Sequence, residues 1–282
     1  MRNDKSSIAI IGPGRVGLAL GRLLADYGGS IIYVAARELA HARRAARFIG
    51  QGEPVGLADP RLPHASIFLL TTSDSALAQV AKDLAKRGSG RMAWHGKIVL
   101  HTCGSLSSAV LRPLKLRGAS IGALHPFQTV PSPRAGVRSL LRCFWGIEGD
   151  PRAVRLARHW VRLLEGVPFP VRPGGKTLYH LSAFLVCPTV VTLMEQSFLL
   201  LGKAGVPPRI AVRMLRQFVA ETAKNFAEMG ARRALTGPAV RGDWATIERH
   251  RSALQHTAPE FVPVYEALLQ AMLRLAGRKA PK

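Results

Sequence analysis

The chain has 282 residues, of which 48% are hydrophobic and 20% charged, and its formal net charge at pH 7 is +23. This composition excludes a disordered chain and allows two domains with buried cores. The three cysteines are far apart in the sequence, which excludes a disulfide framework and a metal site built on paired cysteines. We therefore expect a cytoplasmic protein without a bound metal. The first residues carry no hydrophobic stretch, so we expect no signal peptide.

The positive charge raises the possibility of a nucleic-acid partner. The arginines, however, are scattered over every predicted helix, and no run of five basic residues occurs. The sequence also contains no recognisable nucleic-acid-binding module. We expect no specific nucleic-acid partner and favour a small anionic substrate instead.

A glycine-rich turn follows the first apolar run, residues 8–11, and its sequence is Gly12-Pro13-Gly14-Arg15-Val16-Gly17. A helical pattern begins directly after it, so the turn has the strand–turn–helix context of a dinucleotide-binding motif. In such a turn the first glycine permits the tight bend, the second allows a pyrophosphate to approach, and the third lets the helix pack closely. The free N–H groups of the helix then face the phosphates. We predict that residues 12–17 bind a dinucleotide.

The second predicted strand, residues 31–36, ends at Arg37. NAD-dependent enzymes usually have an acidic side chain near this position, where it binds the ribose hydroxyls. A guanidinium instead suits the extra phosphate of NADP, and Arg43 and Arg44 follow soon after. We therefore favour NADP over NAD, the alternative being that Arg37 is one of many surface arginines.

Three further strands end in polar residues. The apolar run 66–70 leads to Thr72 and Ser73, which we assign to the cofactor, although Ser73 or Asp74 could simply cap the next helix. The run 97–100 leads to His101 and then to Thr102 and Cys103, assigned to the cofactor, and to Ser105, assigned to the substrate. The run 119–124 leads to His125, also assigned to the substrate. Strand ends of a parallel sheet meet at one edge, but His101 and His125 could equally hydrogen-bond to loop backbone.

A strand at 143–149, a helix at 151–165 and an edge strand at 169–171 complete the alternation of strands and helices. This alternation predicts an α/β fold, a mainly parallel doubly wound sheet over residues 1–172. Residues 173–282 read as an all-helical domain.

The longest helical pattern, residues 176–201, is interrupted by Pro188. Its charge-free part, residues 181–194, is shorter than the roughly 20 residues that a membrane span needs. We therefore expect a buried helix kinked at Pro188, and no membrane partner. Helices at 207–229, 244–254 and 259–276 continue the domain.

Proton transfer to a carbonyl or imine requires a positioned side chain. Lys176 and His180 lie four residues apart at the start of the long helix and are the candidates for this role. Arg241 could bind a substrate carboxylate or phosphate, and Asp243 could assist it. The alternatives are a solvated lysine, a histidine packed at a helix start, and a helix cap formed by Asp243.

These motifs together resemble the Rossmann-like bacterial proteins with the domain of unknown function 2520, which are relatives of ketopantoate reductase and pyrroline-5-carboxylate reductase. The resemblance is carried by residues 12–17, 101–104, 124–129, 176–180 and 235–243, together with His250. It implies a Rossmann domain followed by a helical domain like that of 6-phosphogluconate dehydrogenase, a homodimer formed through the helical domain, and NADP-linked reduction. The implied substrate is a small oxo acid or imine, with a ketopantoate-like acid as the best guess.

Two departures from the family pattern affect the function. Cys103 stands where the family usually has serine, and a thiol is a poorer hydrogen-bond donor than a hydroxyl. Pro188 stands where the family tends to have asparagine, so a side-chain donor and a backbone N–H are lost. The alternative to a reductase is therefore a non-catalytic protein that binds NADP as a regulatory ligand.

Overall fold

The computed structural model describes residues 6–87 and 93–279. The chain divides into two compact units, Met1–Cys187 and Pro188–Lys282. The boundary predicted at residue 172 precedes helix α7 (Lys176–Val186), which the first unit retains.

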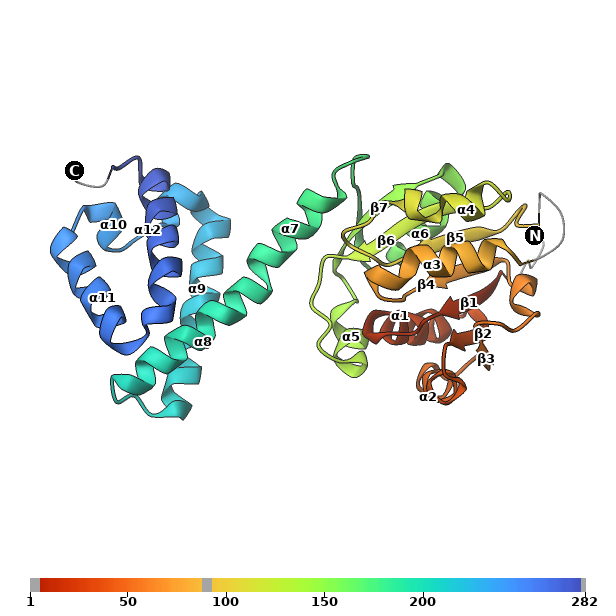
Figure 1. Cartoon of the computed structure of the whole chain (residues 1–282), viewed down its shortest axis with the longest axis horizontal. Helices are drawn as coiled ribbons and strands as arrows, with labels where there is room; N and C mark the ends of the chain where they lie inside the picture. Colours follow the sequence, from red (N-terminus) through yellow and green to blue (C-terminus); the bar gives the residue numbers. More distant parts are fainter. Residues whose placement is uncertain (1–5, 88–92, 280–282) are drawn as a thin grey trace. The chain divides into compact units, whose positions relative to one another are not determined.

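The first unit is built on one eight-stranded sheet in the order β3-β2-β1-β4-β5-β6-β7-β8 (Figure 1). All neighbouring strands pair in parallel except β6 and β7, which are antiparallel. The strands are β1 Ser7–Ile11, β2 Ser30–Ala36, β3 Glu53–Gly56, β4 Ile67–Leu70, β5 Ile98–His101, β6 Ser120–Pro126, β7 Phe144–Gly149 and β8 Val167–Pro170. The predicted α/β sheet is confirmed, and β8 is the edge strand that its prolines predicted.

Helices cover both faces of this sheet. They are α1 Arg15–Asp26, α2 Leu39–Ile49, α3 Asp74–Ala85, α4 Arg112–Lys115, α5 Pro133–Ser139 and α6 Pro151–Leu163. Strand β1 shows why helices pack on both faces of the sheet. Ile8 and Ile10 pack in one core cluster with α1 and α6, whereas Ala9 and Ile11 pack in a second cluster with α3. A strand buried on both faces is continuously apolar, which is how β1 and β4 read in the sequence.

Two elements of the first unit were not predicted. Strand β3 is only four residues long and contains Pro54, so a β signal is weak there. Helix α5 is a seven-residue helix capped by the Ser132 side chain, which accepts a hydrogen bond from the Ala135 N–H. Neither element carries a predicted site residue.

The second unit is helical, as predicted, with α8 Pro188–Lys203, α9 Pro208–Ala234, α10 Pro238–Arg241, α11 Trp244–Thr257 and α12 Val262–Ala276. Its small core joins α10, α11 and α12 through Ala239, Ile247, Leu269 and Leu273. Helix α9 contains a break at Gly230, whose φ of 75° is not helical.

The prediction that the long apolar helix is buried was wrong. Among described residues, α8 has no buried side chain and Lys176 is the one buried residue of α7. By length and composition alone, the stretch Lys176–Lys203 is apolar enough to cross a membrane. An 18-residue window within it has a mean hydropathy of 1.7, and none of that window is buried within the chain. An apolar pattern alone therefore did not show whether this helix packs against the rest of the chain.

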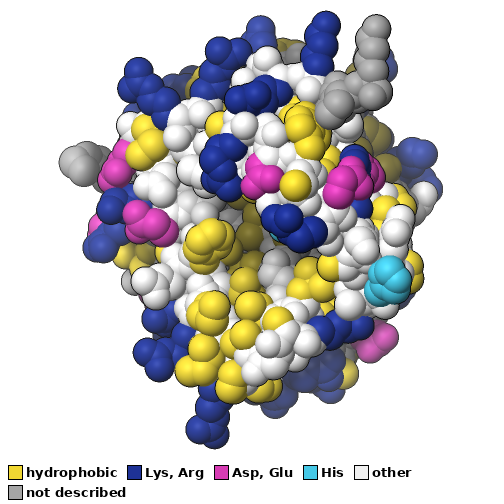
Figure 2. Space-filling view, turned by 90° about the vertical axis from the view of Figure 1, so that its left-hand side faces the viewer, with side chains coloured by type: hydrophobic (Ala, Val, Ile, Leu, Met, Phe, Trp, Pro, Cys, Tyr) yellow, Lys and Arg dark blue, Asp and Glu magenta, His cyan; other side chains and the backbone are white. Residues whose placement is uncertain are grey.

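Basic side chains are spread over the protein surface. Figure 2 shows one face, on which Lys and Arg side chains lie around the whole outline and hydrophobic side chains gather in the middle and lower part. This distribution agrees with the scatter of arginines along the sequence.

Candidate functional site

The glycine turn joins β1 to α1 and lies against the end of β4. Gly12 has a φ of 66°, a left-handed conformation that glycine adopts without steric cost. A Cβ atom on Gly12 would lie 2.2 Å from Thr72 Cγ2, and one on Gly17 would lie 2.0 Å from Thr71 Oγ1. A Cβ on Gly14 would meet only an ordinary contact, 3.4 Å from the Thr71 carbonyl oxygen. The tight bend and the close helix packing predicted for this turn are therefore present.

The amino-terminal end of α1 is free to accept an anion. Gly14 is its N-cap residue and offers no side chain to the first-turn N–H groups, and that turn contains no acidic residue. Uncapped N–H groups and the helix dipole together favour a phosphate at this position. Arg15 turns to the neighbouring loop, where its Nη1 donates to the Pro131 carbonyl at 3.3 Å.

A hollow of about 350 Å³ opens beside the turn. Gly12 and Gly14 form one side of it, and Thr72 and Ser73 at the end of β4 form another. Thr72 Oγ1 is buried and has no hydrogen-bond partner among the described residues. An unpaired buried hydroxyl is unfavourable, so this side of the hollow fits a polar ligand that would supply the partner.

The far side of the hollow is mainly basic. It is lined by Arg37 at the end of β2 and by His41 and Arg44 of α2, with Glu38 as the acidic member of the lining. Arg43, the neighbour of Arg44, lines a different hollow together with Arg47. Of the arginines that follow β2, Arg37 and Arg44 therefore share the hollow and Arg43 does not.

The loop after β5 is held by its own side chains and by Lys176. The Cys103 N–H donates to Nδ1 of the buried His101 at 3.1 Å, which leaves the hydrogen of this neutral imidazole on Nε2. Lys176, only 2% exposed, donates from Nζ to the Cys103 carbonyl oxygen at 2.9 Å. Burial lowers the pKa of Lys176, opposed by the charge of Glu148. Burial also lowers the pKa of His101, to about 3.

Asp74, which was predicted only as a possible helix cap, is hydrogen-bonded to this loop. Ser105 Oγ donates to Asp74 Oδ2 at 2.6 Å and lies 3.3 Å from the Cys103 thiol. Burial raises the pKa of Asp74, but hydrogen bonds from Cys103 and Ser105 outweigh this effect and hold the pKa below the ordinary value. Because Ser73 lines the hollow and Asp74 follows it, the hollow and the loop after β5 adjoin.

Two imidazoles meet over Gly104, and Tyr179 contacts one of them. A Cβ on Gly104 would lie 2.6 Å from both His125 Nε2 and His180 Cδ2. The two imidazole centroids are 6.1 Å apart, and Tyr179 Oη lies 2.9 Å from His125 Nδ1. Burial lowers the pKa of His125 to about 3, helped by the charge of Lys176. Lys176, His180, His125 and Cys103 thus lie close together.

Tyr179 was missed as a site residue. It lies three residues after Lys176, so helical periodicity places both on one face of α7. That spacing was the available signal, but the partner of Tyr179 is 54 residues away in the sequence.

The remaining predicted residues have local roles in the structure. Thr102 donates its N–H to the Leu70 carbonyl, which ties the end of β5 to β4. Arg241 and Asp243 belong to the second unit. Both oxygens of Asp243 accept hydrogen bonds from Thr246, one from its N–H at 3.0 Å and one from its hydroxyl at 2.8 Å. The capping alternative for Asp243 is therefore the one the structure shows.

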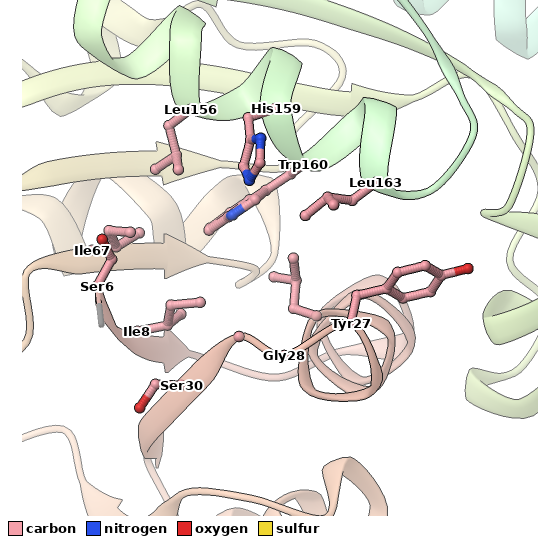
Figure 3. A pocket seen from close by; sticks show the side chains of 12 residues that line it. Ser6, Ile8, Tyr27, Gly28, Ser30, Ile67, Leu156, His159, Trp160 and Leu163 are labelled. Atoms are coloured by element: carbon pink, nitrogen blue, oxygen red, sulfur yellow. The ribbon is translucent and has the colours of Figure 1, made fainter. Parts of the chain in front are cut away.

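A further hollow, of about 280 Å³, lies at the opposite ends of the strands (Figure 3). Ile8, Tyr27 and Ser30 line one side, and His159 and Trp160 of α6 line the other. It contains none of the predicted site residues. Over residues 6–87 and 93–279, no group of three or more His, Cys, Asp or Glu side chains is placed to hold a metal ion.

Two family models match the chain. The Rossmann-like domain model matches residues 1–126, and the model for the domain of unknown function DUF2520 matches residues 143–272. The chain has a Rossmann-like domain followed by a DUF2520 domain. The resemblance drawn from its motifs is therefore confirmed. A comparison with curated proteins found no match.

Solved structures share the fold of this DUF2520 protein over nearly its whole length. A Bacteroides fragilis protein provisionally described as an NADP oxidoreductase is 23% identical, with a TM-score of 0.76 over 95% of this chain and 98% of its own. An imine reductase from Streptomyces aurantiacus is 17% identical, with a TM-score of 0.67 over 95% and 93%. A pyrroline-5-carboxylate reductase from Coxiella burnetii is also 17% identical, with a TM-score of 0.59 over 98% and 100%. The distant structural relatives are thus NAD(P)-dependent reductases.

Proposed function

We propose that this DUF2520 protein is an NADPH-dependent reductase of a small oxo acid or imine. The observation that carries the proposal is the junction between the basic hollow beside the glycine turn and the loop that holds Lys176. Ser73 belongs to the hollow, and the adjacent Asp74 binds Ser105 of that loop. A cofactor in the hollow would therefore extend toward the cluster of Lys176, His125 and His180.

The hollow suits NADPH in its shape and its charge. The turn with Gly12 and Gly14 leaves room for a pyrophosphate at the start of α1, and Arg37 and Arg44 would bind the additional phosphate. Glu38 could accept ribose hydroxyls, which would serve NADH. Because the hollow has two arginines, Arg37 and Arg44, and one glutamate, Glu38, its charge favours NADPH over NADH.

Bound NADPH would supply a hydride to the carbon of a C=O or C=N group. The protein must then deliver a proton to the oxygen or nitrogen, forming the alcohol or amine. Lys176 can donate this proton from Nζ, because burial lowers its pKa and makes the ammonium a stronger acid. His180 is exposed beside His125 and can exchange a proton with solvent. His125 and Ser105 would hold the substrate, and a ketopantoate-like acid remains the preferred substrate.

A non-catalytic NADP-binding protein is the second candidate, favoured by the near-complete burial of Lys176 and its bond to Cys103. The experiment that separates the two measures binding and turnover independently. NADPH should raise the melting temperature and bind in a fluorescence titration, and a panel of oxo acids and cyclic imines should include at least one that oxidises NADPH. Binding without turnover on any member would support the regulatory candidate, and absence of NADPH binding would remove both.

We also propose that a second copy of the chain covers the apolar helices, making the protein a homodimer. The large hydrophobic side chains exposed on α7, α8 and α9 include Leu178, Phe184, Val186, Val191 and Phe218, the last 75% exposed. Exposed apolar surface on this scale is typical of an interface rather than of a monomer. Light scattering coupled to size exclusion should give twice the mass of the 30.5 kDa chain.

A further inference from the structure

Tyr179 and His125 form a hydrogen-bonded pair beside the loop after β5. Tyr179 Oη lies 2.9 Å from His125 Nδ1 and 3.3 Å from the His125 carbonyl oxygen. The two rings meet edge to face, with centroids 5.4 Å apart. Phe127 and Phe169 pack on the tyrosine ring at centroid distances of 5.4 and 5.9 Å, so the ring is held on three sides.

The phenol keeps its hydrogen and is able to donate it in this pair. Burial raises the pKa of Tyr179 well above its usual range, so the hydroxyl keeps its proton, and the backbone N–H of Gly146 provides the hydrogen bond that opposes this shift. The hydroxyl has one hydrogen and two acceptors within reach, His125 Nδ1 at 2.9 Å and the His125 carbonyl oxygen at 3.3 Å. The nearer acceptor is His125 Nδ1.

The other ring nitrogen of His125 has a different environment. An imidazole that accepts at Nδ1 carries its hydrogen on Nε2. His125 Nε2 has no hydrogen-bond partner among the residues that the structure describes. His101 Nε2 is fully buried and unpaired, whereas His125 Nε2 is not fully buried. It lies against Gly104, where the absence of a side chain leaves its hydrogen uncovered.

We propose that Tyr179 is a positioning residue that sets the tautomer of His125, so that Nε2–H is presented as a fixed hydrogen-bond donor to an oxygen of the substrate. The inference rests on the proposed reductase function for the identity of the ligand, but the tautomer itself does not depend on it. His125 then polarises a carbonyl or binds a carboxylate without exchanging its proton. The proton that completes the reduction comes from Lys176 or His180.

The tautomer can be observed directly by NMR of protein carrying ¹⁵N-labelled histidine, with His125→Gln identifying the His125 signals. We expect the Nε2–H tautomer in the unaltered protein, and a mixture of tautomers or the Nδ1–H form in Tyr179→Phe. Phenylalanine retains the ring that packs on Phe127 and Phe169, so the fold should be preserved. An Nδ1–H tautomer in the unaltered protein would overturn the proposal, as would an unchanged Nε2–H tautomer in Tyr179→Phe.

The chain offers a matched control in Tyr265, whose hydroxyl lies 3.2 Å from Nδ1 of the exposed His250, with the rings 6.1 Å apart. Tyr265→Phe removes the same kind of bond in the second unit. It should alter the signals of His250 and leave those of His125 unchanged. A change at His125 in this variant would show that the effect of Tyr179→Phe is not local.

Kinetics test the consequence for the reaction. With a substrate that the protein reduces, Tyr179→Phe should lower kcat/KM about tenfold, the effect of one lost hydrogen bond of ordinary strength, while the Kd for NADPH stays the same. Glutamine can place an amide donor near the position of Nε2, so in the His125→Gln background Tyr179→Phe should cost less than about twofold. An equal loss in both backgrounds would refute a role through His125. If no substrate is reduced, the proposed function fails, whereas the NMR result still decides the tautomer.

Discussion

Arg37 provides the sharpest test of the cofactor assignment. Arg37→Ala should weaken NADPH binding about tenfold and leave NADH binding nearly unchanged. A hydrogen bond to a charged group contributes roughly 1.5–3 kcal/mol. Arg37 is exposed, so solvent and salt bring its contribution just below that range, to about 1.4 kcal/mol or tenfold in Kd. Arg44 and His41 line the same hollow and preserve part of the attraction. Arg37→Asp adds repulsion and should cost more than the alanine variant.

The measurement is a fluorescence titration of NADPH and NADH at low and high salt. Arg43→Ala is the matched control, because Arg43 carries the same charge and lies on the same helix as Arg44 but lines another hollow. It should bind both nucleotides as the unaltered protein does, whereas Arg44→Ala should resemble Arg37→Ala. Equal weakening of NADPH and NADH by Arg37→Ala would refute a phosphate-binding role. A loss in Arg43→Ala as large as that in Arg44→Ala would show that the general positive charge, and not the hollow, attracts the cofactor.

Four further predictions concern the site and the surface. His180→Ala should lower turnover by at least tenfold with unchanged NADPH affinity in the same titration; an unaltered rate would remove His180 from the mechanism. Gly104→Ala should abolish turnover without weakening NADPH, because its Cβ would lie 2.6 Å from two imidazoles. The pKa of His101 is lowered to about 3, so the free energy of unfolding should decrease as pH falls below about 6.5, by up to about 1.4 kcal/mol per pH unit, and His101→Gln should flatten that slope in urea titrations. Phe184→Glu should convert the dimer to monomers in light scattering, and an unchanged mass would refute an interface on α7.

The first half of the fold and much of the site could be predicted because the relevant signals are local. Continuous apolar runs identified strands buried on both faces, and the carboxyl ends of parallel strands meet at one edge of a sheet. The position of His101 at this edge follows directly from the rule, since His101 pairs with Leu70 at the end of the neighbouring strand β4. His125 lies on β6, whose pairing with β5 brings it to the same edge.

What could not be predicted depends on contacts between distant segments. Asp74 was interpreted as a possible helix cap, which its place at the start of α3 permits, but its bond to Ser105 spans 31 residues. Tyr179 gave only the signal of a shared helix face with Lys176. The exposure of α7 and α8 is a similar case. Their apolar pattern predicted burial, but a local pattern does not identify which distant segment, if any, packs against a helix.

Cys103 shows how a departure from a family pattern can be reinterpreted once its contacts are known. As a thiol in place of a hydroxyl it predicted a weaker donor to the cofactor. In the structure the sulfur accepts a hydrogen bond from the Leu106 N–H at 3.2 Å, and burial raises its pKa, so it stays a neutral thiol. The group that reaches the catalytic candidates is the Cys103 carbonyl oxygen, which binds Lys176. Because every residue has this carbonyl, the exchange of serine for cysteine leaves the contact to Lys176 intact, and the departure at position 103 does not by itself argue against a reductase.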